Sequence, residues 1–310
     1  MEYHEIGKTG MKVSALSFGA SSLGAVFHDI NEPRAIEAVH AAVDGGMNFI
    51  DVSPYYGHYK AETVLGKALR EIPRDKYYLS TKVGRYGKDG VNTWDYSGKR
   101  ATESVYESME RLGIDHIDLI NVHDIEFADL NQVVNETLPA LVELRDKGVV
   151  GHVGITDLQL ENIKWVVEHT PEGMIESVMN FCHHTLNDDK ILDFLDLFES
   201  RGIGVINASP FSMGLLTKRG VPAWHPAPQP LVDVCRKAVE HCEAKGCPIE
   251  HLAIRYSISN PRIATTLFSS ANPDNVRRNL ELIEEPADMQ LVAEVRDIIG
   301  DQFRVSWANS

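Results

Sequence analysis

Four side chains near the ends of three successive strand-like segments could together move a proton. Asp51 and Tyr56 lie at and just after the apolar segment 48–52, Lys82 lies near the end of segment 78–83, and His123 follows segment 117–122. A tyrosine hydroxyl titrates at about pH 10, and we expect a neighbouring Lys82 ammonium, oriented by Asp51, to lower that pKa. His123 would hold and polarise the substrate oxygen. The set predicts proton transfer to or from a carbonyl or an alcohol.

Each of these residues also has an ordinary structural explanation. Asp51 could cap a helix, Tyr56 could be a packed loop aromatic, and His123 could be a hydrogen-bonded structural histidine. Lys82 is harder to explain in this way, because lysine is rarely buried at a strand end without a partner. Their joint occurrence at successive strand ends favours the chemical interpretation.

The elements that must position these residues alternate between strand and helix along the chain. Strands are predicted at residues 13–19, 48–52, 78–83, 117–122, 150–155, 177–182, 204–208 and 263–268. Helices are predicted at residues 33–44, 61–70, 97–112, 133–147, 160–169, 188–200 and 231–245, and from 274 onwards. Eight such units in 310 residues predict an α/β fold, a (β/α)8 TIM barrel in a single domain over residues 1–310, with its core at about 13–285 and a tail at 286–310. A doubly wound sheet is the alternative, but no glycine fingerprint follows an early strand.

Two long segments without an expected element follow strands three and seven. They cover residues 84–96 and 209–230. Loops of that length in a barrel are usually functional, so we expect both to act as lids over the site.

Composition narrows the class of partner. The chain carries 45 acidic and 30 basic residues, for a net charge of −15, which argues against nucleic acid. The first residues do not resemble a signal peptide, and no apolar segment approaches the roughly 20 residues that a membrane span needs. We therefore expect a cytoplasmic protein with a small-molecule ligand and neither a nucleic-acid nor a membrane partner; the sequence leaves its oligomeric state open.

The four cysteines raise the question of a metal site. Cys235, Cys242 and Cys247 lie close together beside His241, while Cys182 is remote. None of the spacings is CxxC, and the group falls in a helix-like stretch. We expect reduced thiols and no metal site.

Several segments resemble the successive signatures of the aldo-keto reductase family. They are residues 48–57, 80–82, 122–124, 154–156 and 208–210, and the likeness runs from about residue 13 to 282. Segments 18–21, 123–127, 213–216 and 224–227 resemble the sugar dehydrogenases of that family, the L-galactose dehydrogenases among them. The resemblance implies a barrel with a nicotinamide dinucleotide extended across its mouth. It also implies Tyr56 as the acid/base, Lys82 and Asp51 as its tuning partners, and His123 as the orienting group.

The resemblance further implies which residues hold the dinucleotide. Thr156 and Asp157 stand where the family commonly has Ser-Asn on the nicotinamide amide, although an ionised Asp157 cannot donate a hydrogen bond. Asn180 stands for a glutamine, and Ala208 replaces the tyrosine that usually stacks on the nicotinamide. The full set of expected cofactor contacts is Gly19, Thr156, Asp157, Asn180, Ser209, Pro210, Phe211, Met213, Gly214, Ser269, Ser270, Ala271, Asn275, Arg278 and Asn279.

The choice of cofactor depends on residues 269–275. Relatives that use NADPH usually place a Lys at the first of these positions and an Arg at the seventh, both on the 2′-phosphate. Here the residues are Ser269 and Asn275, and losing two charge-assisted bonds of about 1.5–3 kcal/mol each favours NAD over NADP. Arg277 and Arg278 follow closely, and either could reach the phosphate, although a solvated helix face is the simpler role.

The leading hypothesis is oxidation of an aldose of the L-galactose or L-fucose type at C1 to the lactone, with hydride transfer to NAD. The expected substrate contacts are Tyr56, His123, Trp94, Asp124, Trp224 and His225. The first alternative is an NADPH-dependent reductase of aldehydes or ketones that uses the same four residues. A non-catalytic binding subunit and a metal-dependent lyase or hydrolase are further alternatives.

Overall fold

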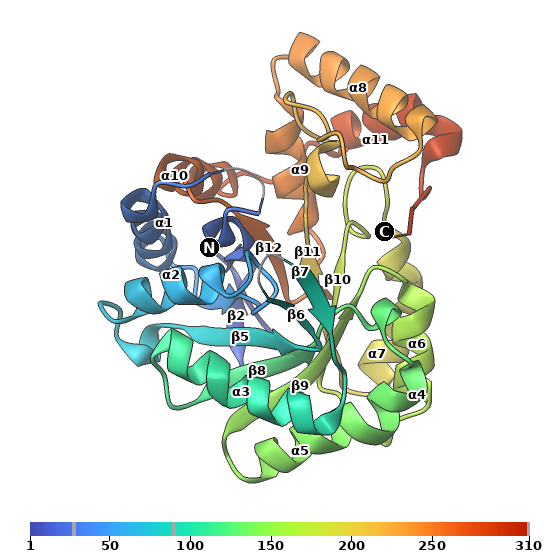
Figure 1. Cartoon of the computed structure of the whole chain (residues 1–310). Helices are drawn as coiled ribbons and strands as arrows, with labels where there is room; N and C mark the ends of the chain where they lie inside the picture. Colours follow the sequence, from blue (N-terminus) through green and yellow to red (C-terminus); the bar gives the residue numbers. More distant parts are fainter. Residues whose placement is uncertain (27–28, 89–90, 309–310) are drawn as a thin grey trace.

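Eight parallel strands close into a barrel surrounded by helices (Figure 1). This computed structural model describes residues 1–26, 29–88 and 91–308. The strands follow each other round the barrel in the order β3, β4, β5, β8, β9, β10, β11 and β12. Their bounds are Leu16–Gly19, Phe49–Asp51, Tyr78–Val83, Ile117–Val122, Val150–Asp157, Ser177–Phe181, Gly204–Ala208 and Thr265–Ser269. The predicted (β/α)8 barrel is confirmed.

Helices separate successive barrel strands and cover the outside of the barrel. They are α1 (Glu32–Asp44), α2 (Lys60–Leu69), α3 (Gly98–Leu112), α4 (Leu130–Gln132), α5 (Leu138–Asp146), α6 (Leu160–Glu168), α7 (Leu195–Ser200), α9 (Ile249–Ser257) and α10 (Pro273–Leu282). A π-helical segment, Val133–Thr137, joins α4 to α5. Ser97 caps α3, where its side chain accepts the N–H of Arg100.

The first predicted strand, 13–19, is two elements. β2 (Lys12–Ser14) pairs antiparallel with β1 (Tyr3–Glu5), and only β3 joins the barrel. The β1–β2 turn lies against the start of β11. Gly7, at φ +52°, is so close to it that a Cβ there would lie 2.4 Å from the nitrogen of Gly204. The hairpin therefore plugs the barrel at the amino ends of its strands.

The segment predicted as an irregular loop after the third strand is a hairpin. β6 (Arg85–Lys88) pairs antiparallel with β7 (Val91–Trp94), with Arg85 opposite Trp94; residues 89–90 of the predicted loop lie outside the described residues. This correction matters because the hairpin fixes where Arg85 enters the site.

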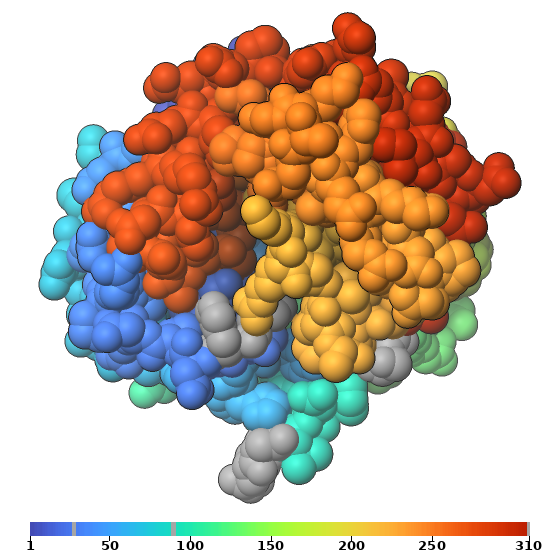
Figure 2. Space-filling model, turned by 90° about the horizontal axis from the view of Figure 1, so that it is seen from above, coloured from blue at the N-terminus to red at the C-terminus, as the bar shows by residue number. Residues whose placement is uncertain are grey.

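The helix predicted at 231–245 is not the one that completes the seventh unit of the barrel. It is α8 (Gln229–Ala244), which packs on α11 (Met289–Ile299), and both lie at one end of the molecule (Figure 1). The helix that packs beside α10 is α9, which the sequence analysis did not predict. Figure 2, seen from above, shows the yellow-to-orange chain after β11 extending across this face.

Candidate active site

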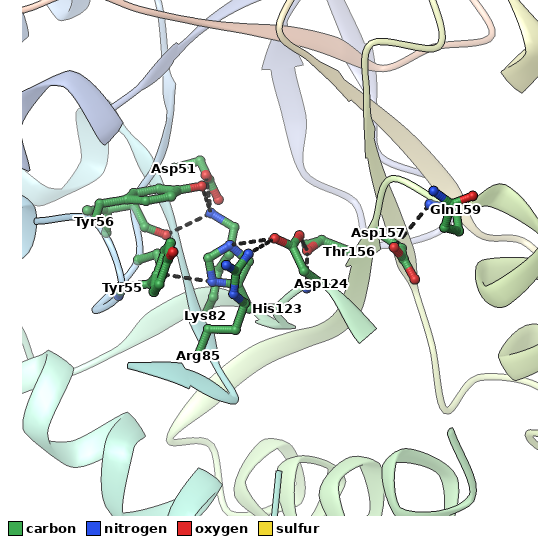
Figure 3. Close-up of polar contacts among 12 residues, drawn as sticks. Asp51, Tyr55, Tyr56, Lys82, Arg85, His123, Asp124, Thr156, Asp157 and Gln159 are labelled. Atoms are coloured by element: carbon green, nitrogen blue, oxygen red, sulfur yellow. Dashed lines mark hydrogen bonds and ion pairs between the residues drawn. The ribbon is translucent and has the colours of Figure 1, made fainter. Parts of the chain in front are cut away.

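The four residues predicted to move a proton lie together at the carboxyl end of three neighbouring strands (Figure 3). Asp51 ends β4, Lys82 lies near the end of β5, His123 follows β8, and Tyr56 lies in the loop after β4. Asp51, Lys82 and His123 are 3%, 1% and 3% exposed, and Tyr56 is partly buried. The sequence thus placed all four correctly in space; their catalytic role remains a prediction.

The ammonium of Lys82 is the centre of this group. It donates to the Oδ2 of Asp51 in a short ion pair, to the carbonyl of Val52 at 2.9 Å and to the hydroxyl of Tyr56 at 3.2 Å. These three acceptors match the three hydrogens of an ammonium. Burial alone would lower the pKa of Lys82, but Asp51 and Tyr56 together raise it above its usual value. Lys82 is therefore a fixed cation held against the Tyr56 oxygen.

Two opposing effects act on the pKa of Tyr56. Burial of its hydroxyl raises the pKa above the usual value, and the lowering effect of Lys82 does not overcome it. Lys82 thus acts in the expected direction, but the net change is upward, because desolvation of a phenolate costs more than one neighbouring cation returns. Tyr56 is a neutral phenol at neutral pH.

His123 is neutral and has one nitrogen directed at the other side chains of the site. Its Nδ1 lies 3.0 Å from the Oγ of Ser53, and its Nε2 lies 3.6 Å from the Oδ2 of Asp124. Burial, with Lys82 and Arg85 nearby, holds the pKa of His123 well below its usual value. A carboxylate beside Nε2 favours the tautomer with its proton there, and the Ser53 hydroxyl then donates to Nδ1. His123 thus presents an N–H donor to the site.

A second charged pair adjoins His123, and one of its two members, Arg85, was not predicted from the sequence. Arg85 Nη1 donates to the Oδ2 of Asp124 in a short ion pair, and the guanidinium lies over the rings of Tyr55 and Phe127, at 4.0 and 4.3 Å from their centroids. Asp124 was predicted as a substrate contact. One feature of the sequence could have pointed to Arg85, which is a basic residue two positions after the end of a buried strand. A buried cation needs a partner there, for the same reason that Lys82 does.

On the next strands, the residues predicted to hold the nicotinamide amide already have other contacts. The hydroxyl of Thr156 donates to the Oδ1 of Asp124 at 3.0 Å and accepts the N–H of Asp124 at 2.8 Å. Its single proton is thus committed to Asp124 and not free for a nicotinamide amide. Asn180 donates its amide to the carbonyl of Ile206 at 3.3 Å, while its buried Oδ1 has no hydrogen-bond partner in the described residues. That oxygen is an acceptor that suits a carboxamide N–H.

Asp157 ends strand β9, just before helix α6, and is not an ordinary ionised acid. Its two oxygens accept from the N–H of Gln159 and the amide of Asn162, both at 3.0 Å. Burial nevertheless raises the pKa of Asp157 to about 8. At neutral pH the carboxyl is therefore mostly protonated, and a protonated carboxyl can donate a hydrogen bond as an asparagine amide can.

The loop after β11, whose residues are predicted to contact the dinucleotide, is conformationally unusual. Ser209, Ser212 and Met213 have φ values of +58°, +46° and +54°, and Gly214 has +114°. Non-glycine residues in this region are uncommon and collect at functional sites. The Oγ of Ser212 donates to the Oδ1 of Asn187 at 2.6 Å, which anchors the loop to the chain after β10. Gly19 lies at the end of β3, and Pro210 and Phe211 belong to this same loop.

Residues 269–279 present hydroxyls and amides, and their two arginines have different partners. Ser269 bonds to Ser22 at 2.8 Å, and Asn275 donates to the Oγ of Ser270 at 3.3 Å. Arg277 pairs with Glu37 at 2.8 Å, while Arg278 donates to the Oδ1 of Asn275 at 2.8 Å. Ala271 is partly buried and Asn279 buried in the same segment. Of the two arginines considered for a 2′-phosphate, Arg278 alone lies against the predicted positions.

Of the loop residues predicted to contact substrate, Trp94 lies near the charged residues of the site, whereas Trp224 and His225 lie in the segment after β11. Trp94, on β7, stacks near Phe127, with 5.8 Å between ring centroids, and so lies beside Arg85. Trp224 is 52% exposed. Both ring nitrogens of His225 make hydrogen bonds to the segment after β11, Nε2 with the carbonyl of Ser212 and Nδ1 with the N–H of Ala227. The ring also packs on Trp307. His225 therefore holds the loop and the chain terminus together.

No group of three or more His, Cys, Asp or Glu residues in the described ranges is placed to hold a metal ion. No helix among those residues is long and apolar enough to cross a membrane. Of the cysteines, Cys182, Cys235 and Cys242 are buried free thiols and Cys247 is a partly buried one.

Comparison with known proteins adds independent evidence. The sequence profile of the Aldo/keto reductase family matches residues 15–299. The chain is 41% identical to L-galactose dehydrogenase of Arabidopsis thaliana over 99% of this chain and 97% of that protein, and 34% identical to D-arabinose 1-dehydrogenase of Saccharomyces cerevisiae over 80% and 76%. An aldo-keto reductase from Bacillus halodurans has the same fold, with a TM-score of 0.80 at 25% identity over 98% and 99% of the two chains. These findings confirm the resemblance seen in the sequence. The chain belongs to the aldo/keto reductase family and is a nicotinamide-dependent oxidoreductase that acts on CH–OH groups.

Proposed function

We propose that the enzyme oxidises an aldose of the L-galactose or L-fucose type at C1 to the lactone, with NAD as the hydride acceptor. The observation that carries the proposal is the Tyr56, Lys82, Asp51 and His123 group in a chain 41% identical to an L-galactose dehydrogenase over nearly its full length. The site offers a proton acceptor and a hydrogen-bond donor at one point, as oxidation of a hydroxyl needs.

The residues divide the reaction between them. NAD, when bound, supplies the hydride acceptor for the hydrogen on C1. The Nε2–H of His123 donates a hydrogen bond to the anomeric oxygen and orients it. Tyr56, a neutral phenol in the enzyme without ligand, must first lose its own proton to solvent. Its phenolate oxygen then takes the hydroxyl proton, and the Lys82 ammonium at 3.2 Å stabilises the negative charge on that oxygen. Asp51 holds Lys82 in place through their ion pair.

The residues of the other strands fit a nicotinamide dinucleotide. The unpartnered Oδ1 of Asn180 would accept from the carboxamide, and the Asp157 carboxyl, protonated below about pH 8, would donate to it. The loop from Ser209 to Gly214 would hold the pyrophosphate. Ser269 and Asn275 are uncharged, which supports NAD over NADP. Arg278, which donates to Asn275, is a cation near these positions that would favour NADP.

The test is an initial-rate screen of aldoses with NAD and with NADP, read at the nicotinamide absorbance. We expect L-galactose or L-fucose with NAD to give the highest kcat/KM and a lactone product. Equal rates across unrelated aldoses, or no turnover of any aldose, would contradict the proposal.

A second candidate function, NADPH-dependent reduction of aldehydes or ketones, is favoured by one observation. The raised pKa of Tyr56 keeps it a neutral phenol, the form that donates a proton to a carbonyl oxygen. This function predicts carbonyl reduction with a large preference for NADPH, which a side-by-side cofactor titration would reveal.

A further inference from the structure

Arg85 occupies an unusual place for a cation. It begins β6, outside the barrel, yet it is only 9% exposed. Its guanidinium lies between the rings of Tyr55 and Phe127 and bonds to Asp124. Stacking between two rings and a carboxylate fixes the position of a planar guanidinium, which a lysine ammonium would not reproduce. Burying a cation in such a site costs free energy, so we expect Arg85 to have a function at the barrel mouth.

The carboxylate that Arg85 holds is shared with His123. The same oxygen, Oδ2 of Asp124, bonds to Arg85 Nη1 and lies 3.6 Å from Nε2 of His123. Asp124 cannot easily turn away, because its Oδ1 accepts the hydroxyl of Thr156 and its own N–H donates to that hydroxyl. Figure 3 shows the two carboxylate oxygens between these partners.

The backbone also keeps Asp124 facing His123. Asp124 has φ +42°, in the left-handed region that costs a non-glycine residue about 1–2 kcal/mol. The hydroxyl of Tyr96 donates to the carbonyls of His123 and Asp124, at 2.7 and 3.0 Å, and so holds this turn. An acid is thus fixed beside the imidazole that the reaction needs as a hydrogen-bond donor.

An unneutralised acid in that place would harm His123 in two ways. It would take the hydrogen bond of Nε2–H away from the substrate, and it would favour the charged imidazolium. The charged and titratable groups around His123 are the Lys82–Asp51 pair, the phenols of Tyr55 and Tyr56 whose rings contact its own, Arg85 and Asp124. Within this set Arg85 is the cation bonded directly to the competing carboxylate.

We propose that Arg85 is a positioning residue that occupies the Asp124 carboxylate and thereby leaves the Nε2–H of His123 free for the substrate oxygen. The inference rests on the proposed function in taking His123 as the donor to the anomeric oxygen. It gives the β6–β7 hairpin a role in the chemistry, since the position of this hairpin determines whether Arg85 reaches Asp124.

A double substitution separates this role from a merely structural one. Arg85→Met keeps a long apolar side chain between the two rings but exposes His123 to the bare carboxylate, and kcat/KM should fall about 100-fold, as for loss of one positioned donor. Asp124→Asn in the same chain removes the competing charge while Oδ1 can still accept from Thr156. The double variant R85M/D124N should therefore be about tenfold more active than R85M. If Arg85 only anchors the hairpin, the second substitution adds to the damage and the proposal fails.

The charge state of His123 gives a readout that needs no turnover. Ring-nitrogen NMR of the unliganded enzyme, with the resonance assigned by its loss in His123→Gln, should show His123 titrating at higher pH in R85M than in the parent chain. The titration should return toward the parent value in R85M/D124N. Arg85→Lys, which keeps the charge, should leave His123 nearer the parent than R85M does. An unchanged His123 titration in folded R85M would overturn the proposal, whatever the sugar screen shows, whereas a failed screen with the shifted titration would reject only the proposed substrate.

Discussion

The two halves of the barrel mouth differ in the charged groups that they contain. The half at the ends of β4, β5 and β8 contains two buried ion pairs, Lys82 with Asp51 and Arg85 with Asp124. The half at the ends of β9 to β12 presents amides and hydroxyls, including Asn180, Ser209 and Ser269, and its buried acid at the end of β9, Asp157, is mostly protonated at neutral pH.

The difference follows from what each half would handle. A proton transfer needs fixed charges in a low dielectric, because those charges set the pKa of the groups that exchange the proton. A dinucleotide brings its own charges, so neutral donors and acceptors are sufficient on its side. The charged half should therefore be sensitive to loss of a single group, and the neutral half should tolerate change and respond mainly in cofactor affinity.

The largest expected effect is loss of the Tyr56 hydroxyl. Tyr56→Phe should lower kcat by about 10³-fold or more, because no other group beside Lys82 can exchange the substrate proton. NAD affinity, measured by fluorescence titration, should remain within a few-fold. Tyr55→Phe is the matched control: its ring packs on His123 and Arg85, and its hydroxyl has no described hydrogen bond, so its activity should stay close to that of the parent. Equal losses in the two variants would remove the special role of Tyr56.

Breaking a buried ion pair in the charged half should also lower the stability of the fold. Lys82→Met leaves Asp51 buried without its cation and should lower the free energy of unfolding by about 3–5 kcal/mol, as measured by urea denaturation. Adding Asp51→Asn should recover much of that loss, because the stranded charge is removed while activity stays absent. In the neutral half, Ser269→Ala should cost less than about 1.5 kcal/mol. A Lys82→Met loss no larger than that of Ser269→Ala would contradict the contrast between the halves.

The neutral half should accept new charge and change its cofactor preference. Ser269→Lys with Asn275→Arg would place two cations where NADPH-using relatives carry them, and should shift the ratio of kcat/KM for NADP over NAD by about tenfold or more. Arg278→Ala should lower the residual activity with NADP and leave NAD nearly unaffected. A parent enzyme that already prefers NADP would show that Arg278 binds the phosphate and that NAD was the wrong choice.

The charged half was easier to foresee from the sequence, for a physical reason. Each of its four predicted residues lies at or just after a short apolar run, and parallel strands of a barrel converge at their carboxyl ends. Asp51, Lys82 and His123 could therefore be placed together without knowing any side-chain geometry. Arg85 could not, because its position depends on the register of a hairpin that lies outside the barrel and has no periodic core face.

For other elements, long-range packing limited what could be predicted from the sequence. The helix at 231–245 was predicted as the seventh barrel helix because its apolar face is clear, but that face packs on α11, more than fifty residues later in the chain. The shorter α9 takes the barrel position instead. The direction of the Tyr56 pKa was likewise beyond the sequence, since it depends on how completely the hydroxyl is removed from water.

The remaining expected effect concerns Asp157 and appears as a pH dependence. The folded chain keeps this carboxyl protonated up to about pH 8, whereas an unfolded chain releases the proton at its ordinary value of 3.8. Between those values the native state binds more protons than the unfolded state, so the free energy of unfolding falls as pH rises. The contribution is fully present below about pH 4 and is lost as pH approaches 8.

Asp157→Asn should therefore flatten the decline of unfolding free energy between pH 5 and 8, by at most about 1.4 kcal/mol per pH unit, the slope of one proton. The carbonyl oxygen of the new amide can still accept from Gln159, and Asn162 can turn its own amide to match. Asp129→Asn is the control, because Asp129 likewise accepts the backbone N–H two residues later but is exposed, and it should keep the parent slope. A slope identical in Asp157→Asn and the parent would mean that Asp157 is ionised in the folded enzyme. The neutral half would then contain a fixed negative charge beside the predicted nicotinamide amide, and the contrast between the halves would no longer hold.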